Sequence, residues 1–153
     1  MKVRIKTIEY YLPPHTEDGA VLKKDNRDWR IGEIENKTGI QVRHIAGADQ
    51  TASDMGYLAS EKLFKSGISK EEIDLLVLIT QSPDYILPAS ACVLQNRLGL
   101  KKSCMAFDIN LGCSGFVYGL SISGSLIETG LVKKALLICS DTYTKYIEKN
   151  DRT

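Results

Sequence analysis

The sequence predicts an α/β protein in which helices cover the faces of a layered sheet. Two apolar runs, 75–80 and 135–140, have the length and composition of buried strands in a parallel sheet. Strand-like and helix-like segments alternate along the chain, as they do in such folds. The helix-like segment after Cys113 carries no charge before Glu128. This predicts a central helix that is buried on most of its sides.

The first fifty residues are predicted to contain one strand and one helix. Apolar and polar residues alternate over 3–8, which indicates a strand that ends before Pro13. A polar segment fills 15–28, and the next segment, 29–36, is predicted to be helical, with Gly39 as its C-terminal stop. The residues at 42–45 fit a short strand or a loop.

Helices and strands then alternate to the end of the chain. Apolar residues recur at helical spacing over 51–64, and Ser69 is expected to cap a short turn after that helix. A second helix is predicted over 88–98, with Gly99 as its C-terminal stop. A strand at 104–110 leads into the segment that contains Cys113.

Composition excludes several classes of partner. The chain has 153 residues, of which 43% are hydrophobic and 25% charged, and its formal net charge is +1. Such a balance lacks the positive field that attracts nucleic acid or an anionic membrane. The longest aliphatic run, 75–79, is far shorter than the ~20 residues of a membrane-spanning helix. We therefore expect no nucleic-acid partner and no membrane partner.

The cysteines indicate a reduced, cytoplasmic protein. None of the four forms a C-x-x-C pair, so zinc and thioredoxin-like sites fit poorly. The N-terminus lacks the apolar core of a signal peptide, and nothing else indicates secretion. Cys92, Cys104 and Cys139 lie in apolar runs and are predicted to be small buried hydrophobes.

Cys113 differs because glycines flank its segment, Gly112-Cys-Ser-Gly115, where a strand meets a helix. Free N–H groups at a helix N-terminus favour the thiolate, and ligands bind at the carboxyl ends of parallel strands. The local pattern supports a catalytic nucleophile and a small buried hydrophobe equally. A nucleophile needs a base, but surface or structural roles fit both His15 and His44 better.

Four segments in order carry a pattern that resembles a known family. They are 37–46 (Lys-Thr-Gly-Ile-Gln-Val-Arg-His-Ile-Ala), 51–59, 107–118 (Phe-Asp-Ile-Asn-Leu-Gly-Cys-Ser-Gly-Phe-Val-Tyr) and 150–153 (Asn-Asp-Arg-Thr). The third resembles the nucleophile segment of β-ketoacyl-acyl-carrier-protein synthase III, a thiolase-fold condensing enzyme. The others are similar to that family's R-T-G-I-x-x-R-x-x-A segment, the helix after it, and its D-R-x-T turn.

The resemblance implies a transferase of fatty-acid biosynthesis with a thiolase-like fold. Cys113 would take an acyl group from acyl-CoA as a thioester, and malonyl-acyl-carrier protein would then condense with it after decarboxylation. The N–H of Cys113 would help form an oxyanion hole, and Lys37 and Arg152 would hold the CoA nucleotide. A homodimer is implied, with CoA thioester as substrate and with no metal and no permanently bound cofactor.

At three positions the chain departs from the family's pattern. Lys37 stands where arginine is usual, and lysine lacks the planar fork of arginine. Glu33 stands where a tryptophan usually stacks on adenine, and Trp29 is expected to be a core or packing aromatic instead. Leu87 stands where a bulky residue usually reaches the acyl pocket across the dimer, which predicts a change in acyl selectivity.

The resemblance also implies that residues 1–153 are an N-terminal half. Family members have two similar halves, and the histidine and asparagine that drive decarboxylation belong to the second. We therefore expect a half-domain that ends before its last strand and does not condense alone. The implied strand order is 3-2-1-4-5 in a mixed sheet, with an unpaired edge at 135–140. Two alternatives stay open: a condensing enzyme of secondary metabolism, and a noncatalytic thiolase-fold module.

Overall fold

The structure is a computed structural model that describes residues 3–148, and the chain forms two compact units. The first unit contains the chain up to Tyr11 together with residues Thr51–Asp141. The second contains Leu12–Gln50 and the described residues from Thr142 onward. No helix within 3–148 is long and apolar enough to cross a bilayer.

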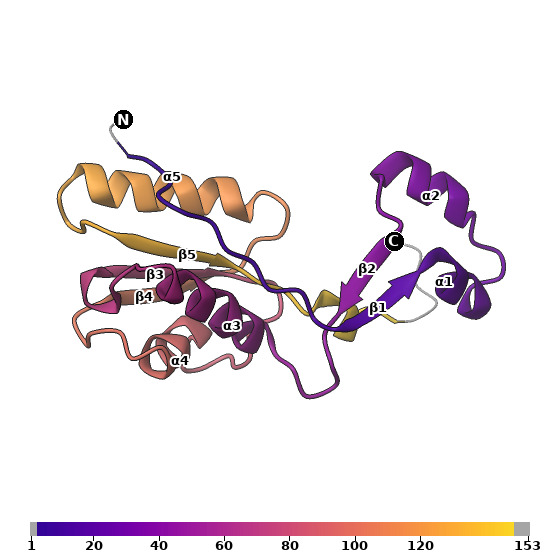
Figure 1. The fold of residues 1–153 in the computed structure, drawn as a ribbon, viewed down its shortest axis with the longest axis horizontal. Coiled ribbons are helices and arrows are strands. Elements are labelled where there is room, and N and C mark those ends of the chain that lie inside the picture. The colour runs from indigo at the N-terminus through magenta and orange to yellow at the C-terminus, as the bar shows by residue number, and fades with distance from the viewer. Residues whose placement is uncertain (1–2, 149–153) are drawn as a thin grey trace. The chain divides into compact units, whose positions relative to one another are not determined.

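A three-stranded parallel sheet forms the centre of the first unit (Figure 1). Its strands are β3 (Leu75–Ile79), β4 (Met105–Ile109) and β5 (Ala135–Cys139), in the order β4-β3-β5. β3 is buried over its whole length because both faces of the sheet are covered. The apolar runs therefore predicted β3 and β5 to within one residue at each end.

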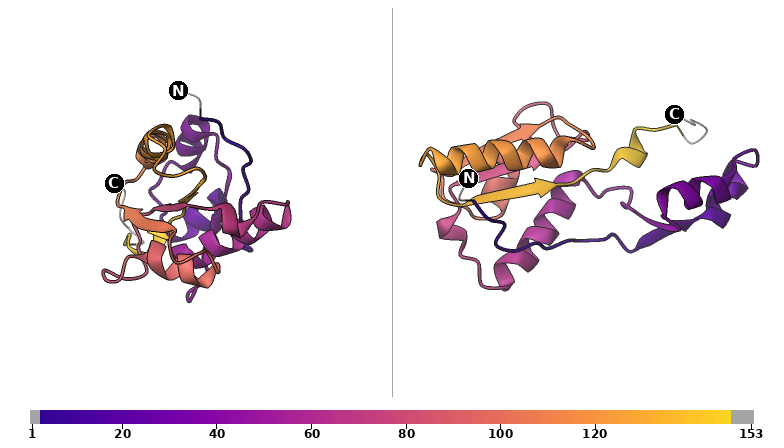
Figure 2. Two further views of the ribbon diagram at one scale, coloured as in Figure 1. Left: turned by 90° about the vertical axis from the view of Figure 1, so that its left-hand side faces the viewer. Right: turned by 90° about the horizontal axis from the view of Figure 1, so that it is seen from above.

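Helices cover both faces of this sheet (Figures 1 and 2). α5 (Gly115–Glu128) packs against β3 and β5 on one face. α4 (Ser90–Arg97) covers the other, with α3 (Ala52–Lys65) packed beside it. α3 begins with a reciprocal cap: the Thr51 hydroxyl accepts from Asp54 N at 3.2 Å, and the Asp54 carboxylate accepts from Thr51 N at 2.9 Å. The α/β layered class is thus confirmed.

Two of the three predicted helix-end signals are confirmed. Gly39 and Gly99 have φ angles of 71° and 68°, in the left-handed region that favours glycine, and each follows the last residue of a helix or its cap. Ser69 precedes a short 3₁₀ helix, Lys70–Glu72, but its side chain makes no capping hydrogen bond. That predicted cap is wrong.

The predicted strand at 3–8 and the predicted strand order are both wrong. Residues 3–10 form no strand, and β3 pairs directly with β5, with Leu75 opposite Ala135. Ile5 and Ile8 are 57% and 74% exposed. The alternation of apolar and polar residues over 3–8 therefore does not correspond to a strand with one buried face. Within 3–148 no strand pairs with the other edge of β5, as expected for 135–140.

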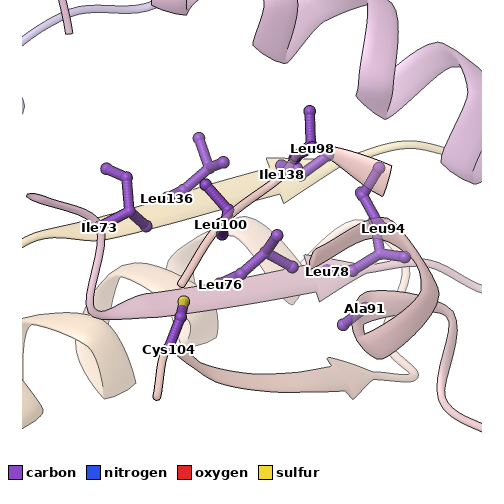
Figure 3. Packing of buried hydrophobic residues seen from close by; sticks show 10 residues of the cluster. All are labelled: Ile73, Leu76, Leu78, Ala91, Leu94, Leu98, Leu100, Cys104, Leu136 and Ile138. Carbon is purple, nitrogen blue, oxygen red and sulfur yellow. The ribbon is translucent and has the colours of Figure 1, made fainter. Parts of the chain in front are cut away.

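Side chains alternate along β3 and divide the core into two layers. Leu76 and Leu78 pack on the α4 side, whereas Leu75, Val77 and Ile79 pack on the α5 side. Both layers are nearly free of solvent, which makes this strand the main source of hydrophobic stabilisation. The layer on the α4 side contains Ile73, Leu76, Leu78, Ala91, Leu94, Leu98, Leu100, Cys104, Leu136 and Ile138 (Figure 3).

α5 is not buried on most of its sides, contrary to the prediction. Only its small-residue face packs on the sheet, and its opposite face is exposed. The lack of charge correctly indicated two apolar faces, but only one of them is covered within the described residues. The buried positions are Gly115, Gly119, Ser123 and Gly124. The exposed apolar positions are Phe116, Val117, Tyr118 and Ile122.

The second unit contains two elements that the sequence did not predict. They are β1 (His15–Asp18) and α1 (Gly19–Asp25), which follows it. β1 pairs antiparallel with β2 (Val42–Ile45), so 42–45 forms a strand, one of the two forms expected for it. The Asp18 carboxylate caps α1 by accepting from a first-turn N–H at 2.9 Å. Both strands are largely exposed, so they lack an apolar alternation that sequence analysis can detect. The expected helix is α2 (Ile31–Thr38), and the antiparallel pair is separate from the parallel sheet.

Asp74 joins the starts of the three parallel strands. Its carboxylate accepts from the Lys101 ammonium, from Lys133 N at 2.8 Å and from Lys134 N at 3.3 Å. The hydrogen bond from Lys101 is the largest cause that holds the pKa of this carboxyl below its usual 3.8, and the hydrogen bonds from the backbone lower the pKa further. The Asp74 carboxylate therefore stabilises the folded state fully above its unfolded-state pKa. This stabilisation is lost as the pH falls through the lower pKa of Asp74 in the folded state.

We expect Asp74→Asn to lower the free energy of unfolding by about 1 kcal/mol at neutral pH. The difference from the wild type should shrink as the pH falls below the ordinary carboxyl pKa of 3.8 and the carboxylate of the folded wild type protonates. Urea unfolding of both proteins at several pH values measures this. A difference that stays the same from neutral to acid pH would contradict the role of the charge.

Candidate active site

Cys113 lies on the turn that joins β4 to α5. The N–H of Gly115 donates to the carbonyl of Gly112 at 2.8 Å, so Cys113 and Ser114 are the central residues of the turn. The thiol residue is exposed. Among residues 3–148, no protein acceptor takes the N–H of Cys113. One residue thus presents both an exposed thiol and an unused hydrogen-bond donor.

The other cysteines have different surroundings. Cys104 is buried as predicted, and burial raises the pKa of its thiol. Cys92 and Cys139 are exposed residues, so their predicted burial is wrong. The thiol of Cys92 donates to the carbonyl of Ala106 at 3.6 Å. Partial burial still raises the pKa of the Cys139 thiol, which disfavours its thiolate.

The space beside the two glycines near Cys113 contains side chains from the end of β3 and from the turn after it. A Cβ on Gly115 would overlap the side chain of Ile79. A Cβ on Gly112 would lie 2.5 Å from Oε1 of Gln81. Both glycines therefore leave room for a neighbouring side chain. They allow the turn to pack directly against the carboxyl end of β3.

Asp108 is a structural residue near the site that sequence analysis missed. Its carboxylate accepts from Ser90 N at 2.8 Å and from Ala91 N at 2.7 Å, at the start of α4. These bonds tie β4 to the first turn of α4, and the loop before α4 carries Leu87 at 85% exposure. The available signal was an acid within an apolar strand, because a buried carboxylate requires hydrogen-bond donors.

Trp29 and Lys37 line one hollow in the second unit. The indole is half-buried and is absent from the hydrophobic core, so the core role is wrong, while a packing role stays a prediction. Lys37 lies in the last turn of α2 and is exposed. Arg152, the other predicted CoA-binding residue, lies outside the described residues. The hollow is lined by Asp28, Trp29, Arg30, Glu33, Ile34 and Lys37.

The two histidines both belong to the second unit. The Nδ1–H of His44 donates to the carbonyl of Pro13 at 2.7 Å, which is the structural role expected for it. His15 lies in β1 opposite Ile45. The structure therefore gives neither histidine the features of a general base.

The chain is similar to β-ketoacyl-acyl-carrier-protein synthase III proteins in sequence and in structure. The model described as 3-oxoacyl-[acyl-carrier-protein (ACP)] synthase III matches residues 107–153. A β-ketoacyl-[acyl-carrier-protein] synthase III from Xanthomonas campestris pv. campestris (strain 8004) is 40% identical over 154 residues, which are 98% of this chain and 46% of that protein. The chain therefore spans about half the length of the curated relatives that it matches.

Solved structures agree with the sequence match. A crystal structure of a 3-oxoacyl-(acyl-carrier-protein) synthase III is similar with a TM-score of 0.88 and 46% identity, over 94% of this chain and 43% of that chain. A tetronic acid condensing enzyme is similar with a TM-score of 0.79 and 30% identity, over 95% of this chain and 45% of that chain.

Proposed function

Because the chain belongs to the β-ketoacyl-acyl-carrier-protein synthase III family over the length that it shares with those proteins, we propose that it carries the acyl-accepting cysteine of a fatty-acid condensing enzyme. Its layered α/β fold is the thiolase-like fold of that family. The observation that supports the proposal best is the position of Cys113: an exposed thiol with an unused N–H, at the start of α5.

In the proposed reaction, the Cys113 thiolate attacks the carbonyl carbon of acyl-CoA. CoA leaves as a thiol, and the acyl group stays on the sulfur as a thioester. The N–H of Cys113 is aimed at the oxygen that becomes negative during this attack. Malonyl-acyl-carrier protein then loses CO₂, and its carbanion attacks the thioester to give a β-ketoacyl product and free Cys113.

Condensation needs more than the described residues supply. We propose that it depends on a histidine and an asparagine from the part of the family's length that this chain does not span, as the resemblance implies. Loading of Cys113 and condensation are thus separable activities. Homodimer formation and a cytoplasmic location belong to the same proposal.

Acyl transfer to the wild-type chain tests the loading step. The protein is incubated with acetyl-CoA or with a longer acyl-CoA, and its intact mass is measured. We expect a gain of one acyl group, which peptide mapping assigns to Cys113. A chain that gains no acyl group, or gains it only at another cysteine, would contradict the proposal.

A second candidate is a condensing enzyme of secondary metabolism. The similarity to a tetronic acid condensing enzyme favours it, and so does Leu87, which replaces the bulkier residue usual in the family. Products of the full-length enzyme, supplied with malonyl-acyl-carrier protein and a range of acyl-CoA donors, separate the two candidates. A Cys113 that reacts with no acyl-CoA would instead favour a noncatalytic thiolase-fold module.

The hollow of the second unit is proposed to take the nucleotide end of CoA. Lys37 would neutralise a phosphate and Trp29 would stack on adenine. We expect Trp29→Ala to weaken CoA binding about tenfold, because stacking of a base on an aromatic ring contributes about 1–3 kcal/mol. Calorimetric titration measures the affinity, with Tyr85→Ala as the control for loss of an exposed ring. Equal affinities for both variants would refute the assignment.

A further inference from the structure

The side chain of Gln81 occupies the space in front of Gly112, one residue before Cys113. A Cβ built on Gly112 would lie 2.5 Å from Oε1, 3.0 Å from Cδ and 3.3 Å from Nε2 of Gln81. All three atoms belong to the terminal amide group. This exposed amide therefore packs against Gly112, and a side chain at position 112 would require either the amide or the turn to move.

The backbone conformation does not explain the glycine at 112. The glycines with positive φ are Gly39, Gly67, Gly99 and Gly130, and Gly112 is not among them. An L-residue would thus fit the local backbone without strain. The group that a side chain at this position would meet is the amide of Gln81.

Asp141 fixes the backbone that carries Gln81. Its carboxylate Oδ1 accepts from Gln81 N at 2.7 Å, and from both the N–H and the hydroxyl of Ser82 at 3.2 and 3.1 Å. The hydroxyl of Thr80 also donates to it at 3.1 Å. Thr80 and Ser82 are almost fully buried, so the turn after β3 is held firmly. Asp141, which follows β5, therefore fixes the position of the Gln81 backbone.

We propose that Gln81 is a positioning residue for Cys113. Its amide limits the movement of Gly112, and so sets the direction of the Cys113 thiol and N–H. Ile79 restrains the turn in the same way at Gly115. The end of β3 thus holds the nucleophile turn from both sides. The catalytic meaning of this inference rests on the proposed acyl transfer, but the packing itself does not.

A double-mutant cycle between the two positions tests the inference. The rate of alkylation of Cys113 by iodoacetamide is measured by peptide mapping for the wild type, Gly112→Ala, Gln81→Ala and the double variant. We expect Gly112→Ala alone to slow alkylation about tenfold, because its methyl group displaces the turn. The double variant should return to within about twofold of Gln81→Ala, since the colliding group is gone.

Gln81→Ala and Gln81→Met separate positioning from a merely structural role. We expect Gln81→Ala to lower the alkylation rate from about pH 6 to 10 while the unfolding temperature stays unchanged, and Gln81→Met to restore the rate by filling the same space. This pair also decides the question if Gly112→Ala does not fold. Gly32→Ala, with open space around its Cβ, is the control and should leave alkylation unchanged.

The four proteins of the cycle, together with Gln81→Met, distinguish failure of this inference from failure of the proposed function. If acyl-CoA loads the wild type but the two substitutions act additively on alkylation, and Gln81→Met equals Gln81→Ala, the positioning role is overturned. If no acyl group is gained by the wild type while the cycle shows strong coupling, the positioning role stands and the acyl-transfer proposal fails.

Discussion

A chain that carries Cys113→Ala is expected to gain no acyl group from acyl-CoA. Alanine removes the sulfur that forms the thioester, and no neighbouring thiol replaces it. Cys104 is buried, and the pKa values of Cys104 and Cys139 are raised, which lowers the share of thiolate in each. We expect the initial rate of labelling to fall about a hundredfold or more, equivalent to at least about 2.7 kcal/mol of transition-state stabilisation.

Cys92→Ala is the matched control for this experiment. Cys92 is also exposed, but it lies in α4 rather than on the turn. We expect it to be labelled at the wild-type rate with radioactive acyl-CoA, and to unfold at the wild-type temperature. Wild-type labelling of Cys113→Ala, or loss of labelling in Cys92→Ala, would place the acyl group elsewhere and overturn the assignment of Cys113.

Burial decided which strands could be predicted from the sequence. β3 is covered on both faces, so selection of apolar residues at every position makes it visible as an apolar run. β1 and β2 are largely exposed and carry no such pattern, although their four-residue pairing is regular. For residues 3–8 the error is the opposite, a strand that was predicted but is not present. Apolar and polar residues alternate there, but no face of the segment is buried.

The candidate site was predictable only where its signal is local. Gly112-Cys-Ser-Gly115 is a continuous motif, and its place between a strand and a helix follows from patterns on either side. Gln81 and Asp141 come from different strand ends and reach the turn only because β5 lies directly beside β3. Since the predicted strand order separated those two strands, these contacts could not be foreseen.

Gly119→Val is expected to lower the free energy of unfolding by about 2–3 kcal/mol. A Cβ at this position would lie 2.6 Å from Cδ1 of Leu137 and 3.0 Å from Cδ1 of Ile79, in the layer between α5 and the sheet. Valine adds two further carbons, so α5 must move away from β3 and β5. A better helix former than glycine offsets only about 0.5 kcal/mol of this cost.

Ser121→Val provides the control, because Ser121 lies on the exposed face of the same helix. Denaturant unfolding should show a loss for Gly119→Val and a change of about 0.5 kcal/mol or less for Ser121→Val. Acyl loading should fall as well in Gly119→Val, since movement of α5 carries the turn with Cys113 away from Gln81 and Ile79. If Gly119→Val were as stable as the wild type, α5 would not depend on close approach to the sheet. The end of β3 would then lack the rigid contact by which we expect it to hold the nucleophile.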